Sequence, residues 1–259
     1  MQIGKTNTML NIFGAAVLLS GCATTPVADS QDPWEGWNRK VQTFNDRFDD
    51  YLMKPVARGY RWITPSFVDT GVSNFFGNIG EVRVLINNAL QGKLLMAGMD
   101  GARFLVNSTA GLGGLFDVAS EIDLPRHKED FDQTLGYWGV EPGPYLVLPF
   151  LGPSSPRGVF GLLGDTAMNP ISYTGLYFTS AWTSRAVSGG LGALNAADLR
   201  ADNLENEKIA SEAALDRYAF FRAAYISQRH YLVHDGNVPP EEEFNLDDLD
   251  ETLSPVTPY

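Results

Sequence analysis

Apolar residues recur at helical spacing from the first part of the chain onward. Between Trp34 and Tyr51 they are three or four positions apart, which places them on one stripe of an amphipathic helix. Asp32 and Pro33 are typical of a helix start, because the aspartate can cap free N–H groups of the first turn. A helix is therefore predicted from about residue 32. Its stripe consists of Trp34, Trp37, Val41, Phe44, Phe48 and Tyr51.

The same periodicity predicts three more helices. One follows Gly80 and ends near Gly92. The next, about residues 93–108, is apolar nearly all round, as expected of a helix that is buried in protein or faces lipid. The last runs from about residue 197 to 233. The apolar stripe of the helix after Gly80 consists of Val82, Leu85, Ile86, Ala89 and Leu90. The stripe of the last helix consists of Ala210, Ala214, Tyr218, Phe221, Tyr225 and Leu232.

Residues 136–156 interrupt the helical pattern. Five prolines break any helix here and several glycines permit turns, while the apolar residues 145–148 are typical of a short strand or one arm of a hairpin. Stiff arms between permissive joints suit a gate or mouth loop, and a rigid structural loop equally well. The residues expected to form the loop at a channel mouth are Gly136, Gly139, Gly143, Pro144, Tyr145 and Pro149.

Two further segments bear on the fold. Gly158, Gly161 and Gly164 recur every three residues, which would let a helix approach another backbone closely, although a glycine-rich loop is equally consistent. Residues 166–184 carry no charge, but their proline, asparagine, serine and threonine content argues against a membrane span. No strand-rich region or repeat is evident, so the fold is predicted to be mainly α.

The N-terminus has the pattern of a bacterial lipoprotein. Lys5 precedes an apolar run, residues 12–19, which is shorter than the about 20 residues that a bilayer span needs. Residues 19–22 match the lipobox that precedes a lipid-modified cysteine. Cys22 is the only cysteine, so no intrachain disulfide can form. We expect a signal peptide over 1–21 and lipid attachment at Cys22. Ala23 resembles an outer-membrane sorting signal.

Charge separates a tether, a body and a tail. The chain is acidic, with a net charge of −12, which makes nucleic acid an improbable partner because phosphate binding requires a basic face. We expect a lipidated tether over 22–31, one folded domain over 32–235 and an acidic tail over 236–259. Phe244 to Leu253 could fold as a short amphipathic helix on a partner, and a merely solvated tail is the alternative.

No pattern of catalytic residues is evident. The sequence contains no G-x-S-x-G elbow, C-x-x-C pair or phosphate-binding P-loop, so no enzyme activity, no cofactor and no ATP-driven step is expected. His230 and His234, four positions apart, suggest either a metal pair or, more simply, histidines that interact with a helix C-terminus. His127 lies among charged residues and is expected to be solvated.

Short motifs along the body resemble those of the MlaA/VacJ family of outer-membrane lipoproteins. The resemblance covers about residues 32–235, with no clear motif between about 154 and 200. The matching segments are Asp32–Arg39, Lys54–Ala57, Ser73–Asn78, Asn87–Gly92, Arg103–Ser108, Gly113–Ala119, Phe131–Val140 and Gly143–Pro149.

This resemblance implies a single domain of amphipathic helices arranged as a ring around a central amphipathic channel, embedded largely in the inner leaflet of the outer membrane. It implies that misplaced phospholipid passes through the channel to a soluble periplasmic carrier, MlaC, and that the protein works beside trimeric porins. Two other interpretations remain: a lipoprotein scaffold that only recruits envelope partners, and an envelope lipid hydrolase. A polar channel would favour transport, whereas a nucleophile beside a base would favour hydrolysis.

Overall fold

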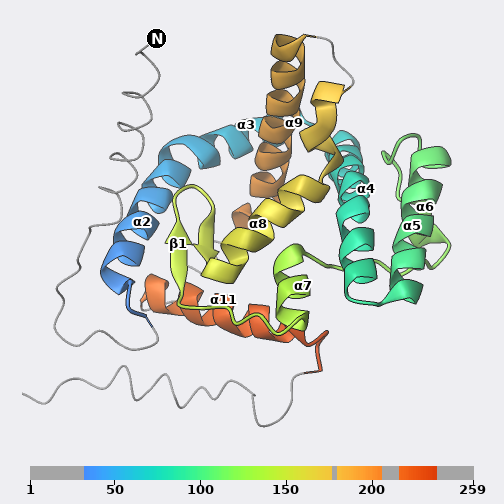
Figure 1. Ribbon diagram of the computed structural model, residues 1–259. Coiled ribbons are helices and arrows are strands. Elements are labelled where there is room, and N and C mark those ends of the chain that lie inside the picture. The colour runs from blue at the N-terminus through green and yellow to red at the C-terminus, as the bar shows by residue number, and fades with distance from the viewer. Residues whose placement is uncertain (1–31, 177–179, 206–215, 238–259) are drawn as a thin grey trace, which may run out of the picture.

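The computed structural model describes residues 32–176, 180–205 and 216–237, which form one mainly helical domain (Figure 1). The predicted fold class is confirmed to that extent. The signal peptide, Cys22, the tether and residues 238–259 lie outside the described residues. The elements, in order, are α2 (Glu35–Phe48), the π-helical turn η1 (Asp49–Met53), α3 (Lys54–Ile63), α4 (Ser66–Leu90), α5 (Leu94–Thr109), α6 (Val118–Glu121), α7 (Phe131–Tyr137), β1 (Leu146–Leu148), β2 (Gly152–Ser154), α8 (Pro156–Met168), the 3-10 helix η2 (Pro170–Leu176), α9 (Ala181–Asp202) and α11 (Arg217–Val233).

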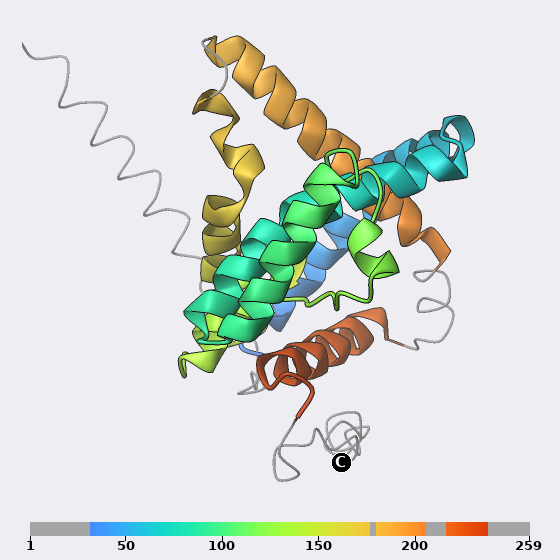
Figure 2. The same ribbon diagram turned by 90° about the vertical axis from the view of Figure 1, so that its right-hand side faces the viewer.

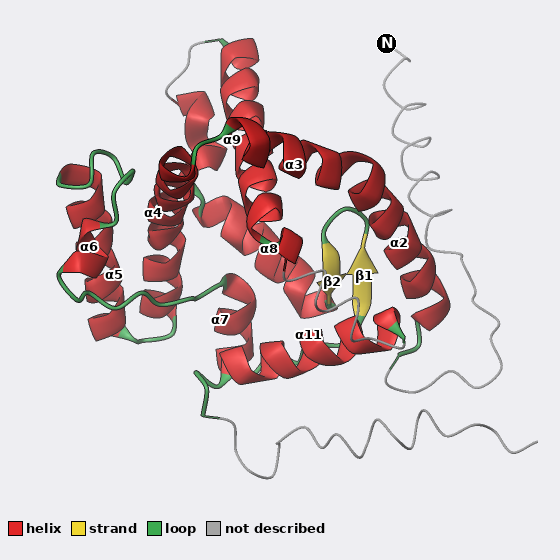
Figure 3. Cartoon of the chain, turned by 180° about the vertical axis from the view of Figure 1, so that it is seen from behind, coloured by secondary structure: helices red, strands yellow, loops and turns green. Residues whose placement is uncertain are grey.

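The packing contacts among these elements follow a closed circuit. α2 continues through η1 into α3, α3 packs on α9, and α9 packs on α4. From α4 the contacts lead through α7 to α11, then through β2 and β1 back to α2. In Figures 1 and 3, α2, α3, α4 and α11 frame the hairpin, α7 and the lower part of α8. Figure 2 shows α5 lying along α4, in agreement with their extensive contact.

The helix starts differ from those predicted in two places. α2 begins at Glu35, and Asp32 does not cap it: the Asp32 carboxylate is buried and accepts hydrogen bonds from Asn38 and Tyr218. α4 begins at Ser66, well before Gly80. Gly77 and Gly80 both lie inside α4. At Gly77 the Arg126 guanidinium takes up the space of a side chain, since a Cβ there would come within 2.4 Å of its Nη2. A glycine in this segment therefore does not mark a boundary of the helix.

The single long helix predicted over 197–233 is wrong. α9 starts earlier, at Ala181, and ends at Asp202, and α11 starts anew at Arg217. The Asp216 side chain accepts hydrogen bonds from the backbone N–H groups of Tyr218 and Ala219, which is a typical N-cap. An aspartate that satisfies these free donors favours a helix start at a position where apolar spacing alone suggests continuity.

The glycines of α8 allow the close approach that their spacing suggested. A Cβ on Gly161 would lie 2.6 Å from Cβ of Asp132 and 2.9 Å from its backbone nitrogen, and a Cβ on Gly164 would lie 2.2 Å from the Phe131 ring. Phe131 and Asp132 form the first turn of α7. Side-chain-free positions on α8 therefore bring α7 into direct backbone contact with it.

The hairpin prediction for residues 145–148 is confirmed. β1 and β2 pair antiparallel, with Leu146 opposite Ser154 and Leu148 opposite Gly152. Gly136, however, belongs to α7, so the loop starts later than expected. Gly139 and Gly143 both have positive φ, 85° and 72°, a backbone conformation that glycine adopts without strain.

The molecule is polar inside and apolar outside. Its cluster of buried hydrophobic side chains is small, comprising Val41, Tyr145, Val147 and Tyr218 with Tyr225 packed against it. Asparagines and charged residues fill much of the remaining interior, among them Asn38, Asn87, Asn88, Asp100 and Arg103. Large apolar side chains on α2, α3, α5, α8 and α9 are exposed instead. Among the described residues, no helix is both long and apolar enough to cross a bilayer.

Candidate functional site

Two asparagines of α2 hold the hairpin. Asn38 donates from Nδ2 to the Tyr145 carbonyl oxygen at 3.0 Å and accepts from the Val147 N–H at 2.8 Å. Asn45 repeats this pair with the Leu148 carbonyl oxygen and the Phe150 N–H, at 2.9 and 2.7 Å. Seven positions separate the two asparagines, so they lie on one face of α2. Each amide thus replaces the peptide group of a neighbouring strand.

A cluster of two arginines and two aspartates joins α7, α8 and α11. Arg229 donates from Nη1 and Nη2 to both oxygens of Asp130, at 2.8 and 2.7 Å, and from Nε to Asp132 at 2.7 Å. Arg157 donates from Nε to the other Asp132 oxygen at 2.8 Å and from Nη1 to the Val140 carbonyl oxygen at 2.9 Å. Each buried charge is therefore compensated, as burial requires.

The cluster also affects the ionisation of Asp130. Burial by itself raises the pKa of this carboxyl, but the hydrogen bonds and charge of Arg229, with further help from the Gln133 backbone N–H, hold the pKa below its ordinary value. Asp130 is also the N-cap of α7 and accepts from the Gln133 N–H at 2.8 Å. The carboxylate is thus ionised at neutral pH and locks α7 to α11.

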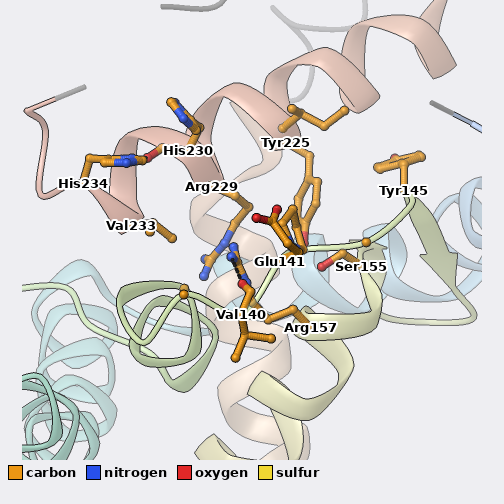
Figure 4. A pocket seen from close by; sticks show the side chains of 15 residues that line it. Val140, Glu141, Tyr145, Ser155, Arg157, Tyr225, Arg229, His230, Val233 and His234 are labelled. Carbon is orange, nitrogen blue, oxygen red and sulfur yellow. Dashed lines mark hydrogen bonds between the residues drawn. The ribbon is translucent and has the colours of Figure 1, made fainter. Parts of the chain in front are cut away.

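A cavity of about 380 Å³ lies beside this cluster, between α11 and the segment that leads into β1 (Figure 4). Four of the predicted loop residues line it: Gly136, Gly139, Gly143 and Tyr145. Pro144 and Pro149 do not. The other lining residues are Val140, Glu141, Pro142, Ser155, Arg157, Tyr225, Ile226, Arg229, His230, Val233 and His234.

A second cavity, about 170 Å³, lies on the other side of Tyr225 and Arg229, which line both. Its wall is completed by Asp130 and Asp132 at the start of α7, by the hairpin residues Leu148, Leu151, Pro153 and Ser154, and by Gly158, Gly161, Leu162 and Asp165 of α8. Tyr225 and Arg229 therefore stand between a cavity next to the hairpin and one next to the C-terminal end of α11. Sequence reasoning missed Arg157 and Arg229, because their partners lie 25 and 97 positions away.

The three histidines occupy different settings. His230 and His234 lie at the C-terminal end of α11, with ring centroids 4.5 Å apart, and His234 Nδ1 lies 2.9 Å from the His230 carbonyl oxygen. This contact is of the kind expected for histidines at a helix end. His127 is not solvated as predicted, because its Nδ1 lies 2.7 Å from the buried Asp100 carboxylate. The described residues contain no group of three potential metal ligands.

Comparison with known proteins agrees with this architecture. The model of the MlaA lipoprotein family matches residues 30–232. The intermembrane phospholipid transport system lipoprotein MlaA of Escherichia coli (strain K12) is 31% identical over 245 residues, which cover 92% of this chain and 94% of that protein. The protein of the same name from Haemophilus influenzae (strain ATCC 51907 / DSM 11121 / KW20 / Rd) is 31% identical, covering 95% of this chain and 98% of its own.

A solved structure, described as the structural basis for maintenance of bacterial outer membrane lipid asymmetry, superposes with a TM-score of 0.66. Its sequence is 31% identical, and the match covers 78% of this chain and 98% of that one. The fold and the sequence lead to the same assignment. The chain belongs to the MlaA lipoprotein family.

Proposed function

We propose that this protein removes misplaced phospholipid from the outer leaflet of the outer membrane through a central amphipathic channel and passes it to a soluble periplasmic carrier. It thereby maintains the lipid asymmetry of that membrane. The reaction is passage of an intact lipid, with no covalent step. The relatives named as intermembrane phospholipid transport lipoproteins support this assignment.

The observation that carries the proposal is the inverted distribution of side chains. Apolar residues that would form the core of a water-soluble protein lie on the outside, as with Trp37 on α2, Trp62 on α3 and Leu95 on α5. Asparagines and ion pairs fill the inside. Such a body is suited to lipid around it and polar groups within it, because exposed apolar patches of this kind mark membrane or partner contacts.

A polar interior also lowers the barrier that limits phospholipid movement. A charged headgroup loses its hydration when it enters hydrocarbon, and that loss is costly unless polar groups replace the water. The acyl tails can remain against the apolar exterior during passage. The chain has no nucleotide-binding loop, so we propose that lipid moves down its gradient or is withdrawn by partners.

The proposed setting is the periplasmic face of the outer membrane of a Gram-negative bacterium. Cys22, in the lipobox, would carry the lipid anchor, and several acyl chains together would make the attachment stable. The proposed partners are phospholipid, the carrier MlaC and a trimeric porin beside the embedded body. The acidic tail from residue 236 is proposed to help dock the carrier, by analogy with other charged segments that fold on a partner.

Lipid analysis of the isolated outer leaflet tests the function. Cells lacking the protein should accumulate phospholipid there, the wild-type gene should reverse this, and a Cys22→Ser variant should not. Accumulation that the wild-type gene fails to reverse would contradict the transport role. Normal lipid content in cells that lack the protein, with altered assembly of envelope partners, would favour the scaffold interpretation.

The predicted role of the hairpin loop as a gate can be tested separately. Asn45 and Phe150 are in direct contact through the Asn45 amide, so cysteines at these two positions can be joined by a short bifunctional thiol reagent. Because Cys22 would be acylated, they would be the only free thiols. If the loop moves during transport, the cross-linked protein should stay anchored but fail to restore outer-leaflet lipid content. Full restoration by the cross-linked protein would make the loop a fixed part of the scaffold.

A further inference from the structure

The larger cavity combines features of a phosphate-binding site. Its volume, about 380 Å³, falls in the range of small-molecule pockets, about 300–1,000 Å³. It is too small for a whole two-chain lipid. Val140, Ile226 and Val233 supply apolar wall, whereas Ser155, Arg157 and Tyr225 supply polar groups. The segment forming one wall also exposes Tyr137 and Trp138 nearby, so apolar surface adjoins the cavity.

Arg157 retains an unused donor at this cavity. Its side chain is only 7% exposed, and its Nε and Nη1 are occupied by Asp132 and the Val140 carbonyl oxygen. Within the part of the chain that the structure describes, Nη2 has no hydrogen-bond partner, and this atom is accessible to solvent. Arg157 lines the larger cavity and not the smaller one. A nearly buried guanidinium thus has free N–H groups available to this space.

The N-terminus of α8 lies at the same wall. Ser155 is its N-cap, accepting from the Gly158 N–H at 3.0 Å, and Pro156 opens the helix. The backbone N–H groups of this first turn are satisfied within the protein, because Pro156 has none and those of Arg157 and Gly158 bond the Pro142 carbonyl oxygen and the Ser155 side chain. The dipole of the 13-residue helix therefore adds positive potential at this wall but no free donor. This potential attracts an anion. The free Nη2 of Arg157 adds a charge-assisted donor for a phosphate oxygen.

A negative charge lies at the rim of the cavity. Glu141, which also lines the cavity, is exposed. A headgroup with a phosphodiester and a nearby amine would therefore meet the free Arg157 N–H inside and a carboxylate outside. A free phosphate ion would use the inner contact alone. The arrangement favours a zwitterionic phosphodiester over inorganic phosphate.

We propose that the cavity between α11 and the segment before β1 is a binding site for the phosphodiester headgroup of a phospholipid, with Nη2 of Arg157 donating to the phosphate. This proposal rests on the transport function proposed above and specifies where the headgroup pauses. The acyl tails stay outside the cavity, next to the apolar side chains near its mouth.

Titration of the acylated full-length protein in a phosphate-free detergent tests the site. The probes are glycerophosphoethanolamine and inorganic phosphate, followed by phosphorus NMR or calorimetry. Wild-type protein should bind glycerophosphoethanolamine saturably and more tightly than inorganic phosphate. Equal or tighter binding of inorganic phosphate would overturn the lipid-headgroup assignment, and no saturable binding of either probe would overturn the site.

Three variants locate the binding. Arg157→Lys keeps the charge but removes the Nη2 donor, so affinity should fall about tenfold or more. Ile226→Trp fills the cavity without changing any charge and should abolish binding, which preserves the test if Arg157→Lys fails to fold. Arg58→Lys, at an exposed position of α3, is the matched control and should bind like the wild type. Unchanged affinity in Ile226→Trp would overturn the assignment.

Failure of the site and failure of the function give different results. If outer-leaflet lipid content depends on the protein but Ile226→Trp supports it fully, the headgroup site is wrong and the transport function stands. If the probe binds as proposed but cells lacking the protein keep normal lipid asymmetry, the transport function is wrong.

Discussion

Asn38 illustrates how one buried polar side chain organises this fold. It is fully buried, binds the Tyr145 carbonyl oxygen and the Val147 N–H on the edge of the hairpin that faces α2, and donates to Asp32, which in turn accepts from Tyr218 of α11. Three segments far apart in the chain meet at this amide. Removing it would leave a buried carbonyl and a buried N–H without a partner and would take one hydrogen bond from the Asp32 carboxylate, and each unsatisfied group carries a desolvation penalty.

We therefore expect Asn38→Ala to lower the free energy of unfolding by about 3 kcal/mol. Asn45→Ala is the matched comparison, because Asn45 makes the same pair of contacts near the hairpin turn, with the half-buried Leu148 and the exposed Phe150. It should cost less than half as much, since water can replace those bonds. Denaturant unfolding in detergent measures both. Equal losses would show that burial does not set the cost.

The Asp130–Arg229 pair gives a pH dependence with a definite sign. The pKa of Asp130 lies below its ordinary value in the folded protein, so its contribution to stability is fully present above the unfolded value of about 3.9. It is lost as the pH falls below that value and through the folded pKa. Asp130→Asn should lower the free energy of unfolding at pH 7 by roughly 2 kcal/mol. On acidification the variant should lose less stability than the wild type does.

Unfolding midpoints between about pH 7 and pH 3 provide the measurement for Asp130. Asp216, whose pKa is also lowered, chiefly by the Arg39 hydrogen bond, is an exposed counterpart. Asp216→Asn should change the pH dependence less, because solvent screens exposed pairs. A wild-type-like acid response in Asp130→Asn would show that the pair does not contribute in this way.

At the level of elements, apolar periodicity located helices better than it located their buried faces. The helix predicted over 93–108 is found at Leu94–Thr109, yet its buried positions include Asp100, Arg103 and Asn107, while Leu95 and Leu105 are exposed. Periodicity reports that a helix has two faces but not which one meets protein, because lipid and a protein core select the same residues.

The candidate site was predictable in part for a similar reason. Glycines and prolines mark irregular backbone locally, so Gly139 and Gly143 could be assigned from the sequence to the loop that lines the larger cavity. The arginine–aspartate cluster could not, because Arg157 and Arg229 find their partners only after α7, α8 and α11 have packed. Local sequence patterns do not indicate which residues pair after the helices have packed.

The α7–α8 contact offers a test at this scale. A methyl group on Gly161 would lie under 3.0 Å from the backbone nitrogen and the Cβ of Asp132, and the backbone cannot move aside without disturbing the Arg157 and Arg229 bonds. Gly161→Ala should therefore destabilise the protein by about 1–3 kcal/mol. Gly189→Ala, on α9 with open space around it, should stabilise it by about 0.5–1 kcal/mol. Thermal unfolding compares the two, and destabilisation by both would contradict the packing argument.

The whole molecule is best understood by asking which solvent each surface meets. All five tryptophans are at least 39% exposed, and Trp62 and Trp182 reach 86% and 78%. Tryptophan is favoured at membrane interfaces, where its ring is buried among lipid and its N–H stays near polar groups. Lipid around the body, as proposed above, would account for this distribution, and none of the described helices is long and apolar enough to cross a membrane.

This leads to a prediction about the intact lipoprotein in vesicles. If the apolar exterior lies in the membrane, brominated phospholipids should quench most of the tryptophan fluorescence, whereas aqueous iodide should have little effect. Trp62→Phe and Trp182→Phe should each reduce the lipid-quenched fraction, because these two rings are the most exposed. Trp34→Phe is the comparison, since Trp34 is the least exposed of the five, and it should change that fraction less. Strong iodide quenching with no effect of brominated lipid would place the tryptophans in water, and the apolar exterior would then have to be a protein interface.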